Sequence, residues 1–203
     1  ESHSKPGGVA HSFSKNGFKF ESGPSLWSGI NTLPTNNPLG QILRSINEKV
    51  TTESYNNWKV FLPEGDFNMG VGNDSFNHVI SNIRNQKALT EWKNFIDRVH
   101  PIAEAANSIP LVSFNPTTAG ILNIIKENSN FIKHFKSIKY LNGSFNKIVD
   151  ENITDSFLKN YINLLCFLIS GMEMKDTNSA AMSTLFSDWF SNGSTLEYPY
   201  GGS

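Results

Sequence analysis

The first residues whose types and spacing could do chemistry are Glu1 and the turn Pro6-Gly7-Gly8. In a dinucleotide-binding βαβ unit, an acidic residue ends the second strand and hydrogen-bonds the ribose hydroxyls of the cofactor. A carboxylate suits this task because it can accept hydrogen bonds from both hydroxyls of a vicinal diol. Glycines, which lack a Cβ, then let the backbone pass close to the cofactor. The same residues are more often a plain exposed turn, so their spacing alone is a weak signal.

Two further stretches combine glycine and proline with aromatic residues. Residues 18 to 29 predict a strand that runs into a Gly/Pro turn. The turn contains Trp27, and a tight structural turn with this ring in the core explains the stretch as well. Residues 196 to 203, Leu-Glu-Tyr-Pro-Tyr-Gly-Gly-Ser, predict a turn when taken alone.

The remaining side chains offer little protein-borne chemistry. The five histidines are scattered, and the sequence has neither a Ser/His/Asp set nor a His/Cys spacing typical of a metal site. His11 is expected near the predicted cofactor turn, although a structural role is favoured for it. The single cysteine, Cys166, lies inside an apolar run, which predicts a buried structural thiol rather than a nucleophile.

The composition is that of a globular protein. The chain has 203 residues, of which 38% are hydrophobic and 17% charged, and its formal net charge is -1. A near-neutral balance argues against a nucleic-acid binder, which would carry a clustered basic face. Lys133, Lys136 and Lys139 recur at spacing three, but this pattern is more typical of a solvated helix face. No run reaches the ~18 apolar residues of a membrane-spanning helix.

The N-terminal part of the chain is predicted to be rich in strands. Asn16-Gly17 between alternating polar and apolar residues predicts a hairpin over residues 9 to 22. A Gly/Pro/Ser/Asn-rich loop is expected over residues 23 to 38. A second hairpin is predicted over residues 57 to 71, with its turn at Pro63-Glu64-Gly65-Asp66.

Helices are predicted from the spacing of apolar residues and from capping signals. Asn37-Pro38 opens a predicted helix over residues 38 to 48, because proline suits a first helical turn. Asp74 is the predicted N-cap of the first helix of a long helical block. Apolar residues at spacings of three and four predict further helices over residues 87 to 107, 117 to 141, 153 to 170 and 177 to 191.

Taken together, these stretches resemble the FAD-dependent oxidoreductases of the amine oxidase and phytoene desaturase superfamily, and especially its carotenoid isomerase-like members. Residues 1 to 8 resemble the Glu-x-x-x-x-Pro-Gly-Gly element that many of these flavoproteins share. Residues 7 to 13 and 17 to 29 look like the stretch that follows it in the isomerase-like subgroup. Later stretches are similar in the same order, so that the resemblance covers essentially the whole chain: residues 37 to 39, 60 to 65, 164 to 168 and 196 to 202.

This resemblance implies a bound FAD and three sets of residues around it. The first would hold the ribose of the adenosine half, the second would pass near the diphosphate and ribityl portion, and the third would lie near the isoalloxazine. The flavin would carry the redox chemistry, so no catalytic side chain and no metal ligand is expected. In this order the implied residues are Glu1, then Gly7, Gly8 and Val9, then Gly23, Pro24 and Ser25.

The implied fold class is α/β, present here as an α+β piece of a Rossmann-like FAD/NAD(P)-binding domain with a largely helical substrate or lid domain. Residues 1 to 72 would be a partial FAD-binding domain with β-hairpins, residues 73 to 192 the substrate-binding domain, and residues 193 to 203 a return into the first. Such a piece is expected to expose sheet edges and apolar faces. Candidate tunnel-lining residues, for each of which core packing is the favoured role, are Trp27, Trp92, Phe114, Phe167, Trp189 and Phe190.

The chain also departs from the superfamily pattern. It is expected to begin after the Gly-x-Gly-x-x-Gly turn and to end before the C-terminal motif that closes over the flavin. Many members carry Arg where this chain has His3 and Val9, and Arg would place a fixed cation near the cofactor phosphates. The isomerase-like subgroup itself often lacks that Arg.

The implied function is a flavoenzyme that acts on a lipophilic polyene such as a carotenoid, by cis–trans isomerisation or by desaturation or saturation of a carbon–carbon bond. Two alternatives stay open: a non-catalytic binding module with the flavoprotein fold, and an amine oxidase of the same superfamily. A carotenoid substrate would imply a plastid location and peripheral association with a photosynthetic membrane. The expected partner is therefore a lipophilic small molecule and not a nucleic acid.

Overall fold

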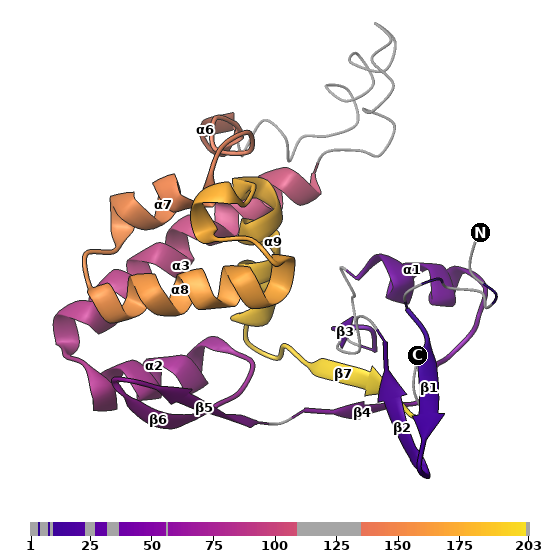
Figure 1. Ribbon diagram of the computed structural model, residues 1–203. Helices are drawn as coiled ribbons and strands as arrows, with labels where there is room; N and C mark the ends of the chain where they lie inside the picture. Colours follow the sequence, from indigo (N-terminus) through magenta and orange to yellow (C-terminus); the bar gives the residue numbers. More distant parts are fainter. Residues whose placement is uncertain are drawn as a thin grey trace, which may run out of the picture. The chain divides into compact units, whose positions relative to one another are not determined.

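The computed structural model describes residues 4, 8, 10–22, 27–31, 37–55, 57–108 and 135–201 of the protein (Figure 1). These residues form a mixed α+β structure, which confirms the fold class at that level. In chain order the elements are β1 (Ser12–Lys15), β2 (Phe18–Glu21), β3 (Trp27–Ser28), α1 (Pro38–Ser45), β4 (Thr52–Ser54), β5 (Trp58–Leu62), β6 (Gly65–Met69), α2 (Asn73–Ile83), α3 (Gln86–Asn107), α6 (Phe135–Ile138), α7 (Phe145–Asn152), α8 (Ser156–Ser170), the short 3-10 helix η2 (Met174–Asp176), α9 (Ser179–Trp189) and β7 (Leu196–Pro199).

The predicted N-terminal hairpin is confirmed as the two-stranded antiparallel ribbon β1–β2. Its register pairs Phe13 with Phe20 and Lys15 with Phe18. Asn16 and Gly17 form the turn with φ values of 53° and 81°. Two successive positive φ angles are what a two-residue turn needs to match the twist of its strands, and Asn-Gly adopts them at low cost.

The second predicted hairpin is also confirmed, as strands β5 and β6 of a separate two-stranded sheet, but its turn is shorter than predicted because β6 already begins at Gly65. A three-stranded sheet, in the order β3-β7-β4, was not predicted. Its central strand β7 pairs antiparallel with β3 and β4, which precede it by well over a hundred residues. The stretch at residues 196 to 199, expected to be only a turn, is therefore a strand that needs distant partners.

The chain divides into two compact units. Unit 1 consists of Glu1–Leu62, Asp66–Phe76 and Ser191–Ser203, and unit 2 of Pro63–Gly65 and Asn77–Phe190. Strand β7 thus returns to the unit that contains β3 and β4, after the helices of unit 2. That these units are an FAD-binding and a substrate-binding domain stays a prediction.

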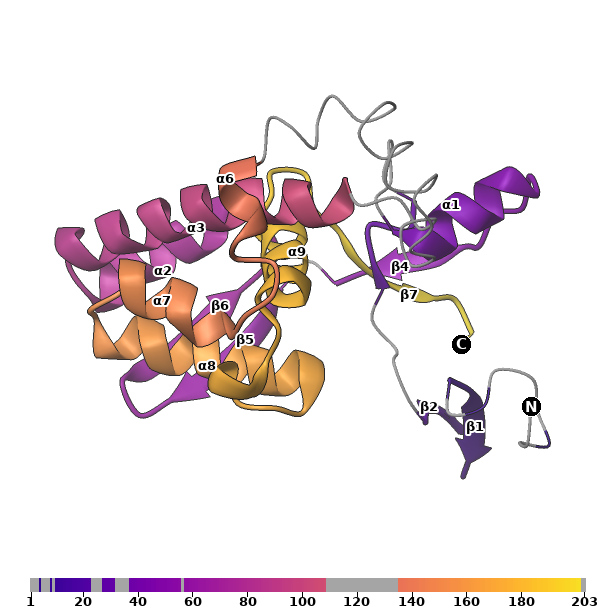
Figure 2. The same cartoon turned by 90° about the horizontal axis from the view of Figure 1, so that it is seen from above.

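Unit 2 is a helical unit built around an aromatic core. Helix α9 crosses α3 and packs closely on it, and α7 contacts both helices (Figure 2). Phe186 of α9 lies 5.1 Å from Phe145 of α7 and 6.1 Å from Phe95 of α3, between ring centroids. Trp92 of α3 packs edge-on against Phe190, with centroids 4.8 Å apart. These side chains are all buried, so packing of apolar helix faces accounts for the core.

The helix boundaries follow their capping residues. Asn37, Asn85, Asp155 and Asn178 cap α1, α3, α8 and α9 through side-chain oxygens that accept backbone N–H groups. These caps explain why α8 and α9 begin later than predicted, since an N-cap residue lies outside the helix. Helix α1 ends at Ser45, earlier than predicted. The prediction that Asp74 caps α2 is wrong, because the helix already begins at Asn73 and Asp74 lies in its first turn.

The helical block also contains one helix that was not predicted, and two predictions about it fall wholly or partly outside the described residues. Helix α7 was not predicted, although Ser144 caps it and Phe145, Ile148 and Val149 form its buried face. The helix predicted over residues 117 to 141 lies mostly outside the described residues, and so do the side chains of Lys133 and Lys136. Lys139 is exposed, and its ammonium lies 4.9 Å from the centre of the Tyr140 ring.

Unit 1 leaves more of its large apolar side chains exposed than buried. Among its described residues the buried ones are Ile30, Phe67, Met69, Phe76 and Leu196. The expectation that apolar faces stay exposed is therefore confirmed for this unit. The exposed ones lie on the β1–β2 ribbon, on and directly after α1, directly after β4, on β5, and on and directly after β7: Phe13, Phe18, Phe20, Leu39, Ile42, Ile46, Tyr55, Phe61, Tyr198 and Tyr200.

Candidate functional site

Of the residues predicted to hold FAD, only Gly8 lies within the described part of the chain. Glu1, Gly7, Val9, Gly23, Pro24 and Ser25 lie outside it. Gly8 has a φ of 59°, in the left-handed region that favours glycine. This φ is typical of a glycine in a tight turn, and the assignment of Gly8 to an FAD site stays a prediction.

His11 fixes the turn that follows Gly8. Its Nδ1 lies 2.7 Å from the carbonyl oxygen of Gly8, a distance at which a protonated Nδ1 donates a hydrogen bond. The carbonyl of His11 in turn accepts the backbone N–H of Ser22 at 2.9 Å. The imidazole thus ties the glycine turn to the base of the β1–β2 ribbon, which is the structural role expected for His11.

A buried carboxylate, Glu197, lies at the centre of the three-stranded sheet of unit 1. It is only 5% exposed and accepts hydrogen bonds from the Asn31 backbone N–H at 3.2 Å and from Thr52 Oγ1 at 3.0 Å. The side-chain amide of Asn31 also donates to Thr52 Oγ1 at 2.7 Å. Burying a carboxylate is costly unless hydrogen bonds compensate, and here donors come from both sides of β7. Glu197 therefore links β7 to Thr52 of β4 and to Asn31, which follows β3 in the chain.

The candidate tunnel-lining residues divide between core and surface. Trp92 and Phe190 are buried in the aromatic core of unit 2, which confirms the favoured packing role. Trp27 and Trp189 are half-buried, whereas Phe167 is exposed on α8 beside Leu168. Phe114 lies outside the described residues. The described aromatic side chains thus give no continuous lining of a tunnel.

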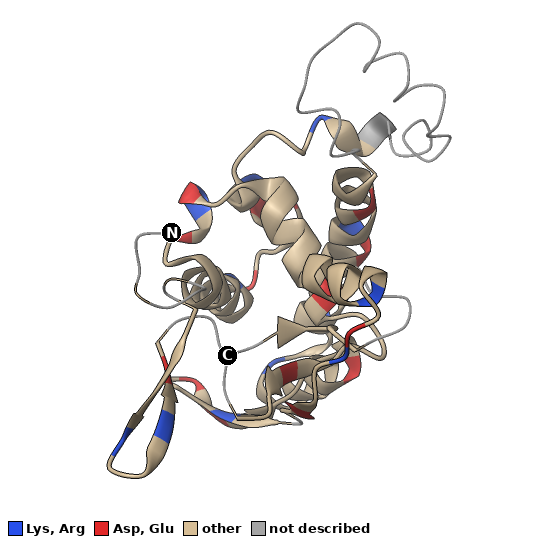
Figure 3. Ribbon diagram, turned by 90° about the vertical axis from the view of Figure 1, so that its right-hand side faces the viewer, with Lys and Arg blue, Asp and Glu red and all other residues tan. Residues whose placement is uncertain are grey.

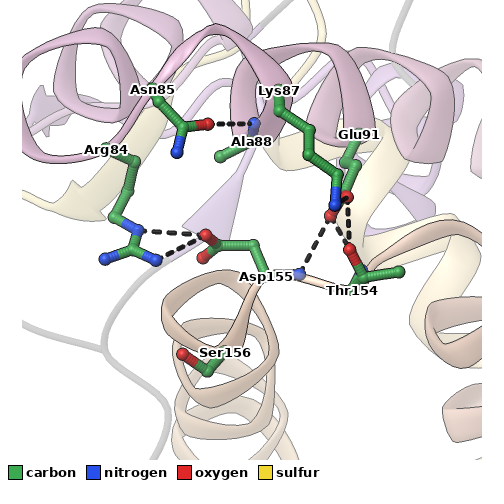
Figure 4. Close-up of a pocket in the computed structure, with 8 residues that line it drawn as sticks. All are labelled: Arg84, Asn85, Lys87, Ala88, Glu91, Thr154, Asp155 and Ser156. Carbon is green, nitrogen blue, oxygen red and sulfur yellow. Dashed lines mark hydrogen bonds and ion pairs between the residues drawn. The ribbon is translucent and has the colours of Figure 1, made fainter.

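A polar pocket of about 310 Å³ lies in unit 2 where α3 and α8 begin (Figure 4). Glu91 of α3 reaches across to the start of α8. There its carboxylate accepts the backbone N–H groups of Thr154 at 2.7 Å and of Asp155 at 2.9 Å, and also the hydroxyl of Thr154. Asp155 accepts two hydrogen bonds from the Arg84 guanidinium and one from the N–H of Leu158. Every carboxylate in this pocket is thus already engaged within the protein.

The electrostatics of the pocket point to a structural junction. Burial by itself would raise the pKa of Glu91, but the hydrogen bonds from Thr154 and Asp155, together with the charge of Lys87, outweigh it and lower the pKa. The hydrogen bond to Asp155 and the charge of that carboxylate raise the pKa of Arg84. Both groups are held in their charged forms, so neither is suited to exchange a proton near neutral pH.

A serine, a histidine and a glutamate that sequence reasoning did not connect come together on the surface of unit 2. His100 Nδ1 lies 2.7 Å from Ser187 Oγ, and His100 Nε2 lies 3.9 Å from a carboxylate oxygen of Glu104. Serine, histidine and glutamate are the residue types that serve as nucleophile, base and orienting acid in catalytic triads. However, Ser187 lies inside α9, where neighbouring N–H groups bond within the helix and cannot bind an oxyanion. With His100 and Glu104 exposed as well, the arrangement fits an inter-helix contact.

Cys166 is buried, as predicted, and is a structural residue of α8. Burial raises the pKa of its thiol to about 11, so the thiolate that a nucleophile requires is scarce at neutral pH. Over the described ranges, no group of three or more His, Cys, Asp or Glu side chains could hold a metal ion. Within the same ranges, no helix is long and apolar enough to cross a membrane.

No protein-family model matches this chain, and a search of curated proteins finds no match either.

Proposed function

We propose that this chain is part of an FAD-dependent oxidoreductase that acts on a lipophilic polyene, by cis–trans isomerisation or by desaturation or saturation of a carbon–carbon bond. The observation that carries this proposal is the order of its motifs, from the Glu1-to-Gly8 element to the stretch at residues 196 to 202. Within this proposal, unit 1 is part of a Rossmann-like FAD-binding domain and unit 2 contributes to the substrate domain.

Three features of the described residues support this reading. Gly8 adopts a left-handed turn conformation, and without a Cβ it would allow the backbone to approach a diphosphate closely. Strand β7 returns to the sheet of unit 1 after the helical unit, as expected of a substrate domain inserted into a cofactor domain. Helix α1 and the residue after it also expose the apolar side chains of Leu39, Ile42 and Ile46, which further strands or helices of a complete domain would cover.

Each protein group would have a separate task. The Glu1 carboxylate would accept hydrogen bonds from the ribose hydroxyls, and Gly7, Gly8 and Val9 would bring the backbone close to the diphosphate. Residues 23 to 25 would lie beside the ring system. A bound flavin would supply the electron transfer that the chemistry needs. The apolar side chains of unit 2 would exclude water from a lipophilic substrate.

A variant pair in the complete protein that contains these residues tests the cofactor assignment. Replacing Glu1 with Ala removes hydrogen bonds to a charged group, which should weaken FAD binding by about tenfold or more. Glu53→Ala is the matched control, because Glu53 is an exposed carboxylate on β4. Equal FAD affinities in the two variants would contradict the assignment of Glu1.

The substrate class requires its own assay. The complete protein, incubated with a poly-cis carotenoid and with oxidised or reduced FAD, should change the absorbance spectrum of the polyene. An unchanged spectrum from a protein that binds FAD would support the flavoprotein assignment and contradict the polyene as its substrate. A protein that binds no FAD would favour the non-catalytic binding module instead.

A further inference from the structure

We propose that one face of the β1–β2 ribbon binds the surface of a lipid bilayer that carries anionic headgroups. This inference is independent of the flavin proposal, because it depends only on the described residues of the ribbon. The face consists of Phe13, Lys15, Phe18 and Phe20. We call these four residues the aromatic face.

Strand geometry places the four side chains together. Directly opposed residues of an antiparallel pair share a face, and so do alternate residues of one strand. Phe13 opposes Phe20, and Lys15 opposes Phe18. The rings of Phe13 and Phe20 stack, with centroids 5.4 Å apart and an interplanar angle of 20°. The opposite face carries Ser12, Ser14, Lys19 and Glu21 and is therefore polar.

The aromatic face is directed to solvent. Phe13, Phe18 and Phe20 are 42%, 69% and 44% exposed, and Lys15 is exposed as well. The opposite face is the one that contacts the body of unit 1, since Lys19 Nζ donates to the carbonyl of Gly201 at 3.1 Å. Three phenylalanines on one side of an otherwise polar ribbon form an exposed apolar patch, and such patches are typical of interaction surfaces.

The charge of the aromatic face indicates which kind of surface it binds. The aromatic face carries one charged residue, Lys15, and no acidic residue, whereas Lys19 lies on the opposite face. The ribbon shows two blue segments near its turn in Figure 3. Apolar rings beside a cation suit the interface of an anionic bilayer, where the rings enter the acyl boundary and the Lys15 ammonium stays with the headgroups. The Asn16-Gly17 turn keeps the strands in register, so the four side chains are presented together.

Vesicle sedimentation with the 203-residue chain tests the proposal. The chain should sediment with vesicles of phosphatidylcholine and phosphatidylglycerol in equal parts and much less with phosphatidylcholine alone. Phe18→Ser should weaken binding by about tenfold or more, because it removes one of the three aromatic rings that the bilayer would bury. Lys15→Ser should weaken binding by about fivefold, and added salt should weaken wild-type binding.

Matched controls separate this face from general adhesion. Phe61 is 68% exposed, against 69% for Phe18, and Lys59 lies over its ring at 4.9 Å. Phe61→Ser and Lys49→Ser should therefore bind vesicles as the wild type does. Equal losses in Phe18→Ser and Phe61→Ser, or no wild-type binding to anionic vesicles, would overturn the proposal. A second copy of the chain would be the partner instead if the wild type did not bind vesicles and if Phe18→Ser, without vesicles, had a lower sedimentation coefficient than the wild type.

A second measurement does not depend on how Phe18→Ser folds. Phe18→Trp keeps an aromatic ring at the ribbon tip, and brominated phosphatidylcholine in the anionic vesicles should quench its fluorescence. Phe61→Trp is the control and should be quenched no more than the native tryptophans. Equal quenching of the two variants would overturn the proposal.

Discussion

Replacing Glu91 with Ala should destabilise the helical unit, because this side chain joins α3 to the start of α8. Its carboxylate accepts two backbone N–H groups and one hydroxyl from Thr154 and Asp155 (Figure 4). Hydrogen bonds to a charged group contribute about 1.5–3 kcal/mol each, but bonds to one carboxylate are not additive. We therefore expect Glu91→Ala to lower the free energy of unfolding by about 2–4 kcal/mol. Glu91→Gln keeps an acceptor oxygen and should cost about half as much.

Urea denaturation followed by circular dichroism at the helix band measures this loss, since most of the helical residues belong to unit 2. Glu104→Ala is the matched control on the same helix, because Glu104 is half exposed and only 3.9 Å from His100. An exposed pair of this kind contributes at most about 1 kcal/mol. Indistinguishable urea midpoints for Glu91→Ala and Glu104→Ala would refute the conclusion that Glu91 stabilises the contact between α3 and α8.

The pH dependence gives an independent check. The fold lowers the pKa of Glu91, so its stabilisation is complete above the unfolded pKa of about 4.3 and is lost as the pH falls through the lower folded value. Wild-type protein should thus lose more stability than Glu91→Gln when the pH falls from about 5 to about 3. An equal acid loss in both proteins would show that Glu91 is not held in its ionised form.

Three further substitutions and one labelling reaction probe separate parts of the structure. Ser183 Oγ is buried with no hydrogen-bond partner among the described residues, so Ser183→Ala should leave stability unchanged or raise it by about 1 kcal/mol in urea denaturation, and a clear loss would contradict this. Ser144→Ala should lower stability by about 1 kcal/mol, because Ser144 caps α7 and donates to the Lys175 carbonyl. Cys166, whose burial raises the thiol pKa to about 11, should react with iodoacetamide only on unfolding, and fast labelling of the folded protein would contradict its burial. Glu197→Ala should lower the urea midpoint more than the exposed-site variant Glu53→Ala does, and equal midpoints would contradict its role in the sheet.

Local features of the fold could be predicted from the sequence. Asn16-Gly17 specifies a two-residue turn by its own backbone preferences, and Asn37-Pro38 specifies a helix start in the same way. Helix α3 follows its apolar spacing and continues through Pro101, where packing of its buried face compensates for a missing N–H donor.

Contacts between distant residues could not be predicted. Strand β7 exists because Leu196 to Pro199 find partners in β3 and β4, and nothing in its four residues indicates which strands these are. Glu91 and Thr154 are 63 residues apart, and His100 and Ser187 are 87 apart. Such pairs depend on how helices cross, which a single sequence does not encode in its local spacing.

The visible absorbance of the complete protein that contains this chain, recorded before and after denaturation, tests the flavoprotein proposal most directly. We expect a flavin band that is released into solution when the protein unfolds, because Glu1, Gly7 and Gly8 would hold FAD without a covalent bond. A colourless protein that also fails to take up added FAD would contradict the proposal.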